Sequence, residues 1–254
     1  MPDHNIVLPS KPKIILEEQT KGVFEIEGLY PGYGHTLGNS LRRIILSSLP
    51  GAAVTSVKIE DVDHEFSTIR GIKEDVLNIT LNLKKIRFKM LTDETQTATL
   101  SANGEGEVYA KDIKLPGQVE ISNPDTYIAK ITDKNTKLNI EIKINKGIGY
   151  MPKEMLSKDK VEIGTIAIDA IFTPVRRVNY EVENMRVGNR TDFNRLKITI
   201  ETDGTLTAKE ALEKSIEIMV QQLKAVIGFK EEEPENFSDE LITEKMKEEI
   251  AQEA

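Results

Sequence analysis

The sequence predicts an α+β fold, and three observations support that prediction. Short runs of alternating apolar and polar residues, typical of half-buried strands, occupy most of the 254 residues. Two longer segments, one early and one late, repeat apolar residues at helical spacing. The stretch between them carries mainly strand patterns over ~120 residues, the size of a separate module. We therefore expect antiparallel sheet, two long helices and a β-rich middle region.

The first strands and the first helix lie within the first fifty residues. Lys13–Glu18 and Gly22–Tyr30 alternate apolar and polar residues, which predicts two strands. A Pro-Gly-Tyr-Gly turn ends the second strand. A helix is predicted from Gly34 to about Leu49, because a Pro-Gly pair follows the apolar repeat there.

The middle region carries seven short strand patterns separated by clusters of Gly, Pro, Asn and Asp. They are Val54–Ile59, Ile86–Leu91, Ala98–Ser101, Glu107–Ile113, Tyr127–Ile131, Leu138–Ile144 and Ile163–Ile171. One short helix is predicted at Lys73–Leu83. Glu74 and Asp75 would lie in its first turn and favour its positive end.

The last third returns to longer elements. Arg177–Val187 and Leu196–Thr202 read as strands, and an Asp-Gly turn ends the second. A helix is predicted at Ala208–Ile227, because Thr207 and Glu210 form a capping box and Gly follows its last residue. After it the chain becomes acidic. Its final segment, Ser238–Ala254, is expected to form a solvated helix.

The composition limits the class of protein. The net charge of −8 and 5% aromatic residues, with no Trp, argue against a broad nucleic-acid surface. The lack of cysteine excludes disulfides and thiolate metal sites and fits a reducing cytosol. No apolar run can span a bilayer, and the first residues lack the order of a signal peptide. We therefore expect a cytoplasmic protein that faces other proteins.

The helix Gly34–Leu49 has an apolar face and a mixed face. The apolar stripe, typical of a core, consists of Leu37, Leu41, Ile44, Ile45 and Leu49. The opposite face places Leu46 between Arg42 and Arg43. Interfaces favour arginine around an apolar centre, but single exposed leucines are also common. This face is equally consistent with an interface and with solvent.

The helix Ala208–Ile227 carries apolar residues along its whole length. Its stripe consists of Leu212, Ile216, Met219, Leu223, Val226 and Ile227. Burial in one large domain would cover this stripe, and so would packing against the same helix of a second copy. Periodicity does not separate the two.

No set of residues suggests catalysis. The three histidines, His4, His35 and His64, share no spacing with carboxylates that would form a metal site or a proton relay. His35 begins a helix, where it is more often a cap than an anion ligand. The glycines around it fit no nucleotide-binding loop. We predict no catalytic residue, no cofactor and no metal.

Two further patterns carry weak signals. The run Lys84–Lys89 is basic with one aromatic residue, but a strand with one solvated face explains it better than nucleic-acid binding. The pair Asp61 and Asp63 has no third group beside it in the sequence to complete a metal or acid–base site.

One long motif carries a family resemblance. The segment Gly34–Ser48, Gly-His-Thr-Leu-Gly-Asn-Ser-Leu-Arg-Arg-Ile-Ile-Leu-Ser-Ser, resembles the signature helix of bacterial RNA polymerase alpha subunits, and a shorter form occurs in archaeal and eukaryotic counterparts. The resemblance extends from about Lys13 to Phe229. Further matching blocks are His64–Thr68, Gly71–Leu77, Leu81–Lys84, Gly147–Pro152, Asp169–Val175, Tyr180–Glu183, Arg186–Val187, Arg190–Asp192 and Glu201–Thr205.

The resemblance implies a domain arrangement and a function. Residues 1–51 and 171–229 would form a discontinuous dimerisation domain, an antiparallel sheet plus two long helices. Residues 52–170 would form an inserted β-rich domain, and residues 230–254 an acidic, linker-like tail. The chain would homodimerise and scaffold assembly of the beta and then the beta-prime subunit of DNA-directed RNA polymerase, without catalytic residues of its own. DNA would be reached only through the whole enzyme.

The resemblance also assigns contact residues. The expected dimer interface is Leu37, Leu41, Ile44, Ile45, Leu49, Leu212, Ile216, Met219, Leu223 and Val226. The expected contacts to the beta subunit are Arg42, Arg43 and Lys84. The expected contacts to the beta-prime subunit are Val175, Arg186, Arg190 and Asp192.

Two features depart from the family pattern. Family members usually continue into a small helical carboxy-terminal domain that binds promoter DNA, and no such pattern precedes Ala254. Arg176 stands where the family often has an acid. A small-molecule enzyme with an anion site at Gly34 and an independent nucleic-acid-binding protein are the competing hypotheses.

Overall fold

The computed structural model describes residues 6–156 and 164–227. The chain divides into two compact units, residues 1–218 and 219–254. The first unit contains every described strand, three helices and the first half of a fourth. The fold is α+β with antiparallel sheets, as predicted.

A four-stranded sheet joins the two ends of the sequence. Its order is β1–β2–β15–β14, and every neighbouring pair is antiparallel. Phe24 of β2 lies opposite Ile198 of β15, more than 170 positions away. The strands are β1 (Lys13–Glu17), β2 (Lys21–Leu29), β14 (Val175–Val187) and β15 (Arg190–Thr202).

The β14–β15 hairpin is longer than the sequence suggested. The predicted second strand began at Leu196, whereas β15 already begins at Arg190. Residues 190–195 are mostly polar and charged, so they lack the alternation that marks a half-buried strand. Pairing with β14 extends the hairpin to a tight turn, where Gly188 has a positive φ of 61°.

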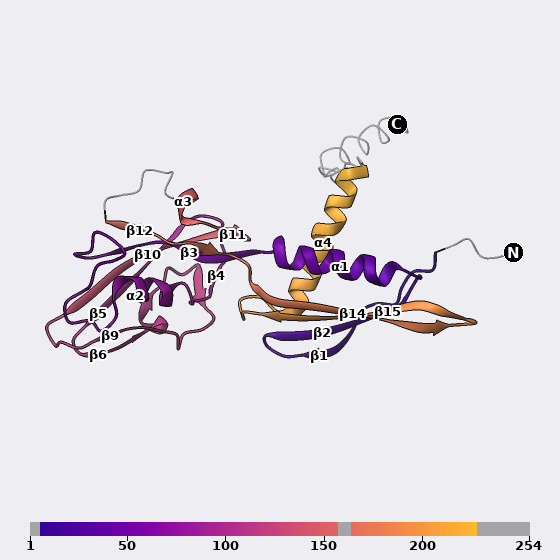
Figure 1. Cartoon of the computed structure of the whole chain (residues 1–254), viewed down its shortest axis with the longest axis horizontal. Coiled ribbons are helices and arrows are strands. Elements are labelled where there is room, and N and C mark those ends of the chain that lie inside the picture. Colours follow the sequence, from indigo (N-terminus) through magenta and orange to yellow (C-terminus); the bar gives the residue numbers. More distant parts are fainter. Residues whose placement is uncertain (1–5, 157–163, 228–254) are drawn as a thin grey trace, which may run out of the picture. The chain divides into compact units, whose positions relative to one another are not determined.

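A seven-stranded antiparallel sheet forms the middle region (Figure 1). Its path is β7–β5–β10–β3–β4–β8, and β12 also pairs with β3. Its core is built mainly from Ile, Val and Leu of the inward-facing positions. The strands are β3 (Pro50–Ile59), β4 (Phe88–Met90), β5 (Gln96–Asn103), β7 (Ile113–Lys114), β8 (Val119–Ile121), β10 (Lys137–Ile148) and β12 (Thr165–Ala167).

Two small sheets complete the middle region. One pairs β6 (Gly106–Tyr109) with β9 (Tyr127–Ile131), and the other pairs β11 (Tyr150–Met151) with β13 (Ala170–Ile171). The short helix α3 (Lys153–Leu156) follows β11. Neither β8 nor α3 was predicted, because elements of three or four residues carry too little periodicity.

Two predicted strands are interrupted in the structure. The run Glu107–Ile113 bends after β6 into a 3-10 turn, because the Asp112 carboxylate accepts a hydrogen bond from Tyr109 N at 2.8 Å. The run that ends at Ile171 divides into β12 and β13. Ile163, where that run was expected to begin, lies outside the described residues.

Helix α2 (Val76–Leu83) begins three positions later than predicted. Asp75 is its N-cap and accepts a hydrogen bond from Asn78 N at 2.7 Å. Glu74 does not serve the helix. Its carboxylate accepts hydrogen bonds from the Tyr127 hydroxyl at 2.6 Å and from Lys130 N at 2.7 Å. Burial, and then Glu74, raise the pKa of Tyr127.

Helix α4 (Ala208–Ile227) has the predicted bounds and the predicted cap. Glu210 N donates to Thr207 Oγ1 at 3.2 Å, and Thr207 N donates to Glu210 Oε2 at 3.1 Å. Gly228, the acidic tail, its expected terminal helix and His4 lie outside the described residues. Among the helices of the described ranges, none is long and apolar enough to cross a membrane.

Candidate subunit-docking surface

Helix α1 (Tyr33–Ser47) lies close against the four-stranded sheet because two of its residues have no side chain (Figure 1). A Cβ on Gly34 would lie 2.7 Å from Val182 Cγ1, and a Cβ on Gly38 would lie 2.6 Å from Tyr180 Cδ2. These distances are too short for real contacts, so β14 can approach the helix only where glycine stands. The two glycines of the family motif therefore fix the distance between helix and sheet.

The start of α1 is capped from a distant strand. Asn194 of β15 is buried, and its Oδ1 accepts hydrogen bonds from Gly32 N at 2.9 Å and Gly34 N at 3.3 Å. The residue before the helix, Gly32, has no side chain for this role. Because Asn194 occupies these amides, the structure does not support an anion site at this end. His35 instead packs edge-on against Tyr180.

The apolar stripe of α1 faces its own sheet. Leu41 and Ile45 are buried within the single chain, whereas Leu37 and Ile44 are half-buried. Leu49 is buried too, but it lies after the helix, which ends at Ser47 rather than at the predicted Leu49. Leu212 of α4 is also buried. A side chain that its own chain covers has almost no area left for a second copy. These four buried residues therefore support the core of the chain rather than the expected dimer contact.

The apolar stripe of α4 becomes exposed in the second unit. Ile216, in the first unit, is half-buried, and so is Met219, where the second unit begins. Beyond it Leu223 is 54% exposed and Val226 is 85% exposed. Val220 and Ile227 are exposed as well. An apolar helix face that remains in solvent is typical of an interface.

The two arginines of α1 differ in their contacts. Arg42 Nε donates a hydrogen bond to Val178 O at 3.2 Å, so it satisfies a carbonyl on β14, an edge strand of the sheet. Arg43 is exposed, and within the described ranges its guanidinium makes no hydrogen bond or ion pair. Leu46 between them is half-buried. Arg43 is therefore the freer of the two for a partner.

Lys84 lies where α2 ends and contacts the loop before β13. Its Nζ is 3.5 Å from Asp169 Oδ2, and Asp169 Oδ1 accepts a hydrogen bond from Lys153 N at 3.0 Å. The backbone bond from Lys153, and then the charge of Lys84, lower the pKa of Asp169. Burial and the nearby Asp169 raise the pKa of Tyr150. These contacts tie α2, α3 and the β11–β13 pair together.

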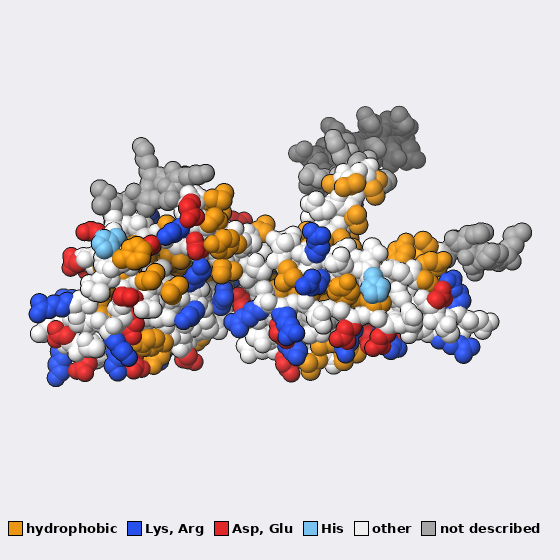
Figure 2. Space-filling model, in the orientation of Figure 1, with side chains coloured by type: hydrophobic (Ala, Val, Ile, Leu, Met, Phe, Trp, Pro, Cys, Tyr) orange, Lys and Arg blue, Asp and Glu red, His pale blue; other side chains and the backbone are white. Residues whose placement is uncertain are grey.

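Exposed apolar side chains gather around these ion pairs, and Figure 2 shows hydrophobic side chains over β11 and α3. Phe66 is 76% exposed and Tyr150 is 60% exposed. Lys153 Nζ reaches Glu65, the neighbour of Phe66, at 3.0 Å. We call this surface the docking surface; its apolar members are Phe66, Leu77, Leu81, Ile148, Tyr150, Met155 and Ile171.

The end of α1 adjoins the docking surface. A Cβ built on Gly149, next to Tyr150, would have Ser47 O as its neighbour at 3.9 Å. Ser47 Oγ in turn donates to Arg43 O at 2.7 Å. Two segments that the sequence separates by a hundred residues thus meet here. Arg43 and Lys84 therefore lie on elements that border the same apolar surface.

Sequence reasoning missed the docking surface, although one signal for it was present. Leu77 and Leu81 are spaced four residues apart on α2, opposite a buried face that includes Ile79 and Leu83. A helix with apolar residues on both faces indicates a partner on each side.

The residues expected to contact beta-prime are mostly engaged within the chain. Val175 is buried. Arg186 Nε donates to Gly188 O at 2.8 Å, inside the β14–β15 hairpin. Arg190 forms a two-point ion pair with Asp192, at 3.0 and 2.6 Å, and lies over the rings of Tyr30 and Phe193. The charged side chains of the hairpin are thus held in fixed positions by contacts within the chain.

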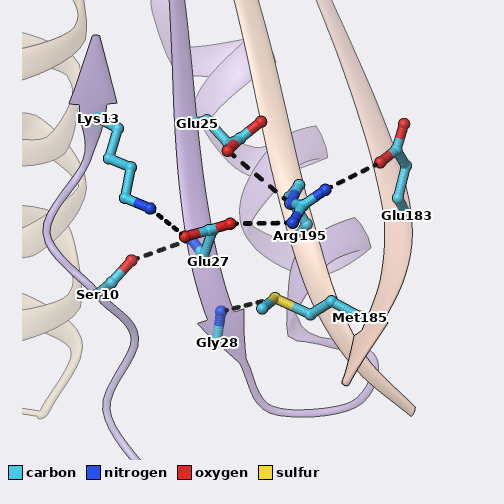
Figure 3. Close-up of polar contacts among 8 residues, drawn as sticks. All are labelled: Ser10, Lys13, Glu25, Glu27, Gly28, Glu183, Met185 and Arg195. Carbon is cyan, nitrogen blue, oxygen red and sulfur yellow. Dashed lines mark hydrogen bonds and ion pairs between the residues drawn. The ribbon is translucent and has the colours of Figure 1, made fainter. Parts of the chain in front are cut away.

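A polar network links the strands of the four-stranded sheet (Figure 3). Arg195 of β15 lies 3.0 Å from Glu27, 3.8 Å from Glu25 and 3.6 Å from Glu183. Glu27 also pairs with Lys13 of β1. Lys13, and then Arg195, lower the pKa of Glu27. Because each of these charges already has a partner of opposite sign within the network, the network serves the sheet rather than a ligand.

The weaker sequence patterns lie in different places: Asp61 and Asp63 line a cavity of about 670 Å³, whereas the basic run contacts its own chain. Lys85 Nζ bonds Asn82 at 3.0 Å, and Arg87 lies 3.7 Å from Asp203, so the basic run is largely used inside the chain. Among the residues described, no three His, Asp or Glu side chains are grouped to hold a metal ion.

The chain is similar to known proteins over most of its length. A family model described as the RNA polymerase Rpb3/RpoA insert domain matches residues 57–173. Proteins named DNA-directed RNA polymerase subunit alpha are 48% identical in Roseiflexus castenholzii and in Symbiobacterium thermophilum, each over 89% of this chain. The corresponding protein of Alkaliphilus metalliredigens is 50% identical over 87% of this chain.

This similarity also covers most of the relatives. The chain spans 69% of the Roseiflexus protein, 72% of the Symbiobacterium protein and 71% of the Alkaliphilus protein. The chain therefore belongs to the family of bacterial DNA-directed RNA polymerase alpha subunits.

Proposed function

We propose that this chain is a scaffold of bacterial DNA-directed RNA polymerase. It homodimerises, recruits the beta subunit and then the beta-prime subunit, and contributes no catalytic residue. One observation carries this proposal: a free Arg43, the Lys84–Asp169 pair and seven exposed apolar side chains border one surface. Interfaces combine such an apolar centre with arginine and a polar rim.

The domain arrangement is part of the proposal. Residues 1–51 with 171–229 form a discontinuous dimerisation domain, residues 52–170 an insert, and residues 230–254 a linker-like tail. Two facts support this division. The four-stranded sheet draws its strands only from Lys13–Leu29 and Val175–Thr202, and the insert-domain family model matches residues 57–173.

The dimer contact is assigned to side chains that the single chain leaves uncovered. On α4 these are Leu223 and Val226, with Val220 and Ile227 beside them. On α1 they are Leu37 and Ile44, which are half-buried. Burial of these apolar areas against a second copy would contribute about 25 cal/mol per Å². Four residues that the resemblance assigned to the dimer interface are buried in the single chain, and they act indirectly by holding both helices in place. They are Leu41, Ile45, Leu49 and Leu212.

The docking surface is assigned to the beta subunit. Stable subunit interfaces bury at least about 1,200 Å² in total, and seven exposed apolar side chains from separate segments fit a folded partner better than a peptide. Arg43 is the strongest candidate for a dominant contact, because its guanidinium has no partner among the residues that the structure describes. Lys84 is already paired with Asp169, so it contributes less.

The test is co-purification of the beta subunit with the tagged full chain. Arg43→Ala and Tyr150→Ser are expected to reduce the bound beta subunit at least about tenfold, the effect of losing ~1.4 kcal/mol. The matched control is Lys137→Ala. Lys137 is exposed at the opposite end of β10 from Ile148, roughly 36 Å away along the strand.

The dimer must survive these substitutions for the test to be valid. Sedimentation is expected to show dimers for wild type and for all three variants. Equal amounts of beta subunit on wild type, Arg43→Ala and Tyr150→Ser would show that the docking surface is assigned wrongly.

A further inference from the structure

A cavity of about 150 Å³ lies at the junction between the seven-stranded sheet and the start of α4. It contains no residue of the docking surface. Six parts of the sequence meet around it. The lining consists of Pro50–Ala52, Phe88–Met90, Lys146, Pro174, Thr205, Leu206 and Lys214.

The charges that line the cavity have one sign. Lys89, Lys146 and Lys214 come from β4, β10 and α4, and the lining includes no carboxylate. Lys146 forms an ion pair with Asp93, whose side chain is largely in solvent. Lys89 and Lys214 have no ion-pair partner in the part of the chain that the structure describes. Neither ammonium group is therefore held in an ion pair among the described residues.

Besides Asp93, the acidic group Glu210 lies beyond the lining, and its carboxylate already has a role. Glu210 caps α4 through its contacts with Thr207, and the backbone bond from Thr207 is the largest cause that lowers the pKa of Glu210. The charges of Lys214 and Lys89 contribute to the same shift. Lys89 and Lys214 are placed around one cavity by its lining, and Glu210 feels the charge of both.

The size of the cavity limits what it can hold. Its volume corresponds to about five water molecules at ~30 Å³ each, and it is well below the ~300 Å³ at which pockets for drug-sized ligands begin. Three ammonium groups provide donors for the oxygens of a compact anion. Apolar walls from Phe88, Pro50 and Pro174 lower the local dielectric constant and strengthen that attraction.

We propose that this cavity binds a small phosphate-class anion, such as inorganic phosphate or pyrophosphate, through Lys89, Lys146 and Lys214. The anion connects β4 and β10 with α4, so its binding stabilises the folded chain. At ten times its dissociation constant it is expected to raise the unfolding midpoint by about 3 °C. The proposal does not depend on the docking of any polymerase subunit.

The test is calorimetric titration of the full chain with pyrophosphate at constant ionic strength. Lys89→Gln and Lys214→Gln are expected to weaken binding at least tenfold each. The matched control is Lys209→Gln, which removes an exposed charge from the same helix but does not alter the lining. It is expected to change the affinity less than twofold.

Two further measurements are needed. One distinguishes a free anion from the phosphates of a nucleotide, and the other distinguishes loss of binding from loss of folding stability. A nucleoside triphosphate is expected to bind more weakly than pyrophosphate, because the cavity has no room for a nucleoside; the reverse order would overturn the choice of a free anion. Without ligand, both glutamine variants are expected to unfold at the wild-type midpoint or above it, because like charges are removed. A lowered midpoint would instead indicate a structural role for these lysines.

Two results would overturn the site itself. One is the absence of saturable binding of pyrophosphate by wild type up to about 10 mM. The other is an equal loss of affinity in Lys209→Gln, which would reduce the effect to overall charge.

Discussion

The two long helices share one sequence pattern and differ in what covers it. The stripe of α1 is covered mostly by the chain's own sheet: Ile45 is fully buried, whereas Leu37 and Ile44 are half-buried. The stripe of α4 begins buried at Leu212 and ends with Val226 in solvent. Periodicity thus identifies an apolar face, but it does not identify the partner of that face. The contrast separates residues that hold the chain together from residues available to a second copy.

The largest effect is expected in the core of α1. Ile45→Ala should lower the free energy of unfolding by about 3 kcal/mol, because it leaves a cavity under a fully buried side chain. Val226→Ala is the comparison, since it removes a similar group from an exposed position. Urea denaturation at several protein concentrations measures both. The loss of unfolding free energy in Ile45→Ala should not vary with protein concentration, whereas any such loss in Val226→Ala should. The opposite pattern would contradict the assignment of α1 to the core and of the end of α4 to the dimer contact.

The next largest effect is expected on the exposed half of α4. Leu223→Arg should weaken dimerisation at least about 100-fold, because it places a charge in an apolar contact. Gln221→Arg, on the other side of the same helix, is the matched control and should leave dimerisation unchanged. Sedimentation velocity measures both. Dimers of normal affinity in Leu223→Arg would exclude this face from the interface.

A smaller effect is expected at the start of α1. Asn194→Ala should cost about 1–2 kcal/mol of stability, because Gly32 N and Gly34 N lose their acceptor. Asn184→Ala is the control, since it removes only the partner of the Asn194 side-chain amide, at 3.3 Å. It should cost less than about 0.5 kcal/mol. Thermal unfolding compares the stability of the two variants. Equal losses of stability would show that the lost helix cap does not cause the effect of Asn194→Ala.

The smallest effect is expected in acid, at the polar rim of the docking surface. The folded state lowers the pKa of Asp169, so the stabilisation is complete above the unfolded value near 4. It is lost as pH falls from there through the lowered pKa of the folded state. Because Asp169 is over a third exposed, the loss is below about 1 kcal/mol. Asp169→Asn should remove this part of the acid dependence of urea unfolding; an unchanged curve would contradict the assignment.

The sequence predicted those elements whose signals are local. Thr207 and Glu210 lie three residues apart, so the start of α4 was correct to the residue. Gly188 and the polar stretch after it show no apolar alternation, so nearly the first half of β15 was missed. Asn194 caps α1 from 160 residues away, and no local pattern can indicate such a contact.

The candidate site was predicted only in part, because most of its contacts join residues that are far apart in the sequence. Arg43 followed from the family resemblance, and its guanidinium bonds to no residue in the ranges 6–156 and 164–227. The burial of Leu41 and Leu212 did not follow, because a helical stripe looks the same under a sheet and under a second copy. The docking surface could not be assembled from sequence, since it needs Phe66, Leu81 and Tyr150 on three elements brought together by Lys153 and Asp169.

The scaffold role itself has a direct measurement. The full chain is mixed with its beta subunit at micromolar concentration, and the mass of the complex is determined by light scattering after size exclusion. The predicted result is one complex of two alpha chains and one beta subunit, lost in Tyr150→Ser but retained in Lys137→Ala. A complex containing a single alpha chain, or no complex with wild type, would contradict the account.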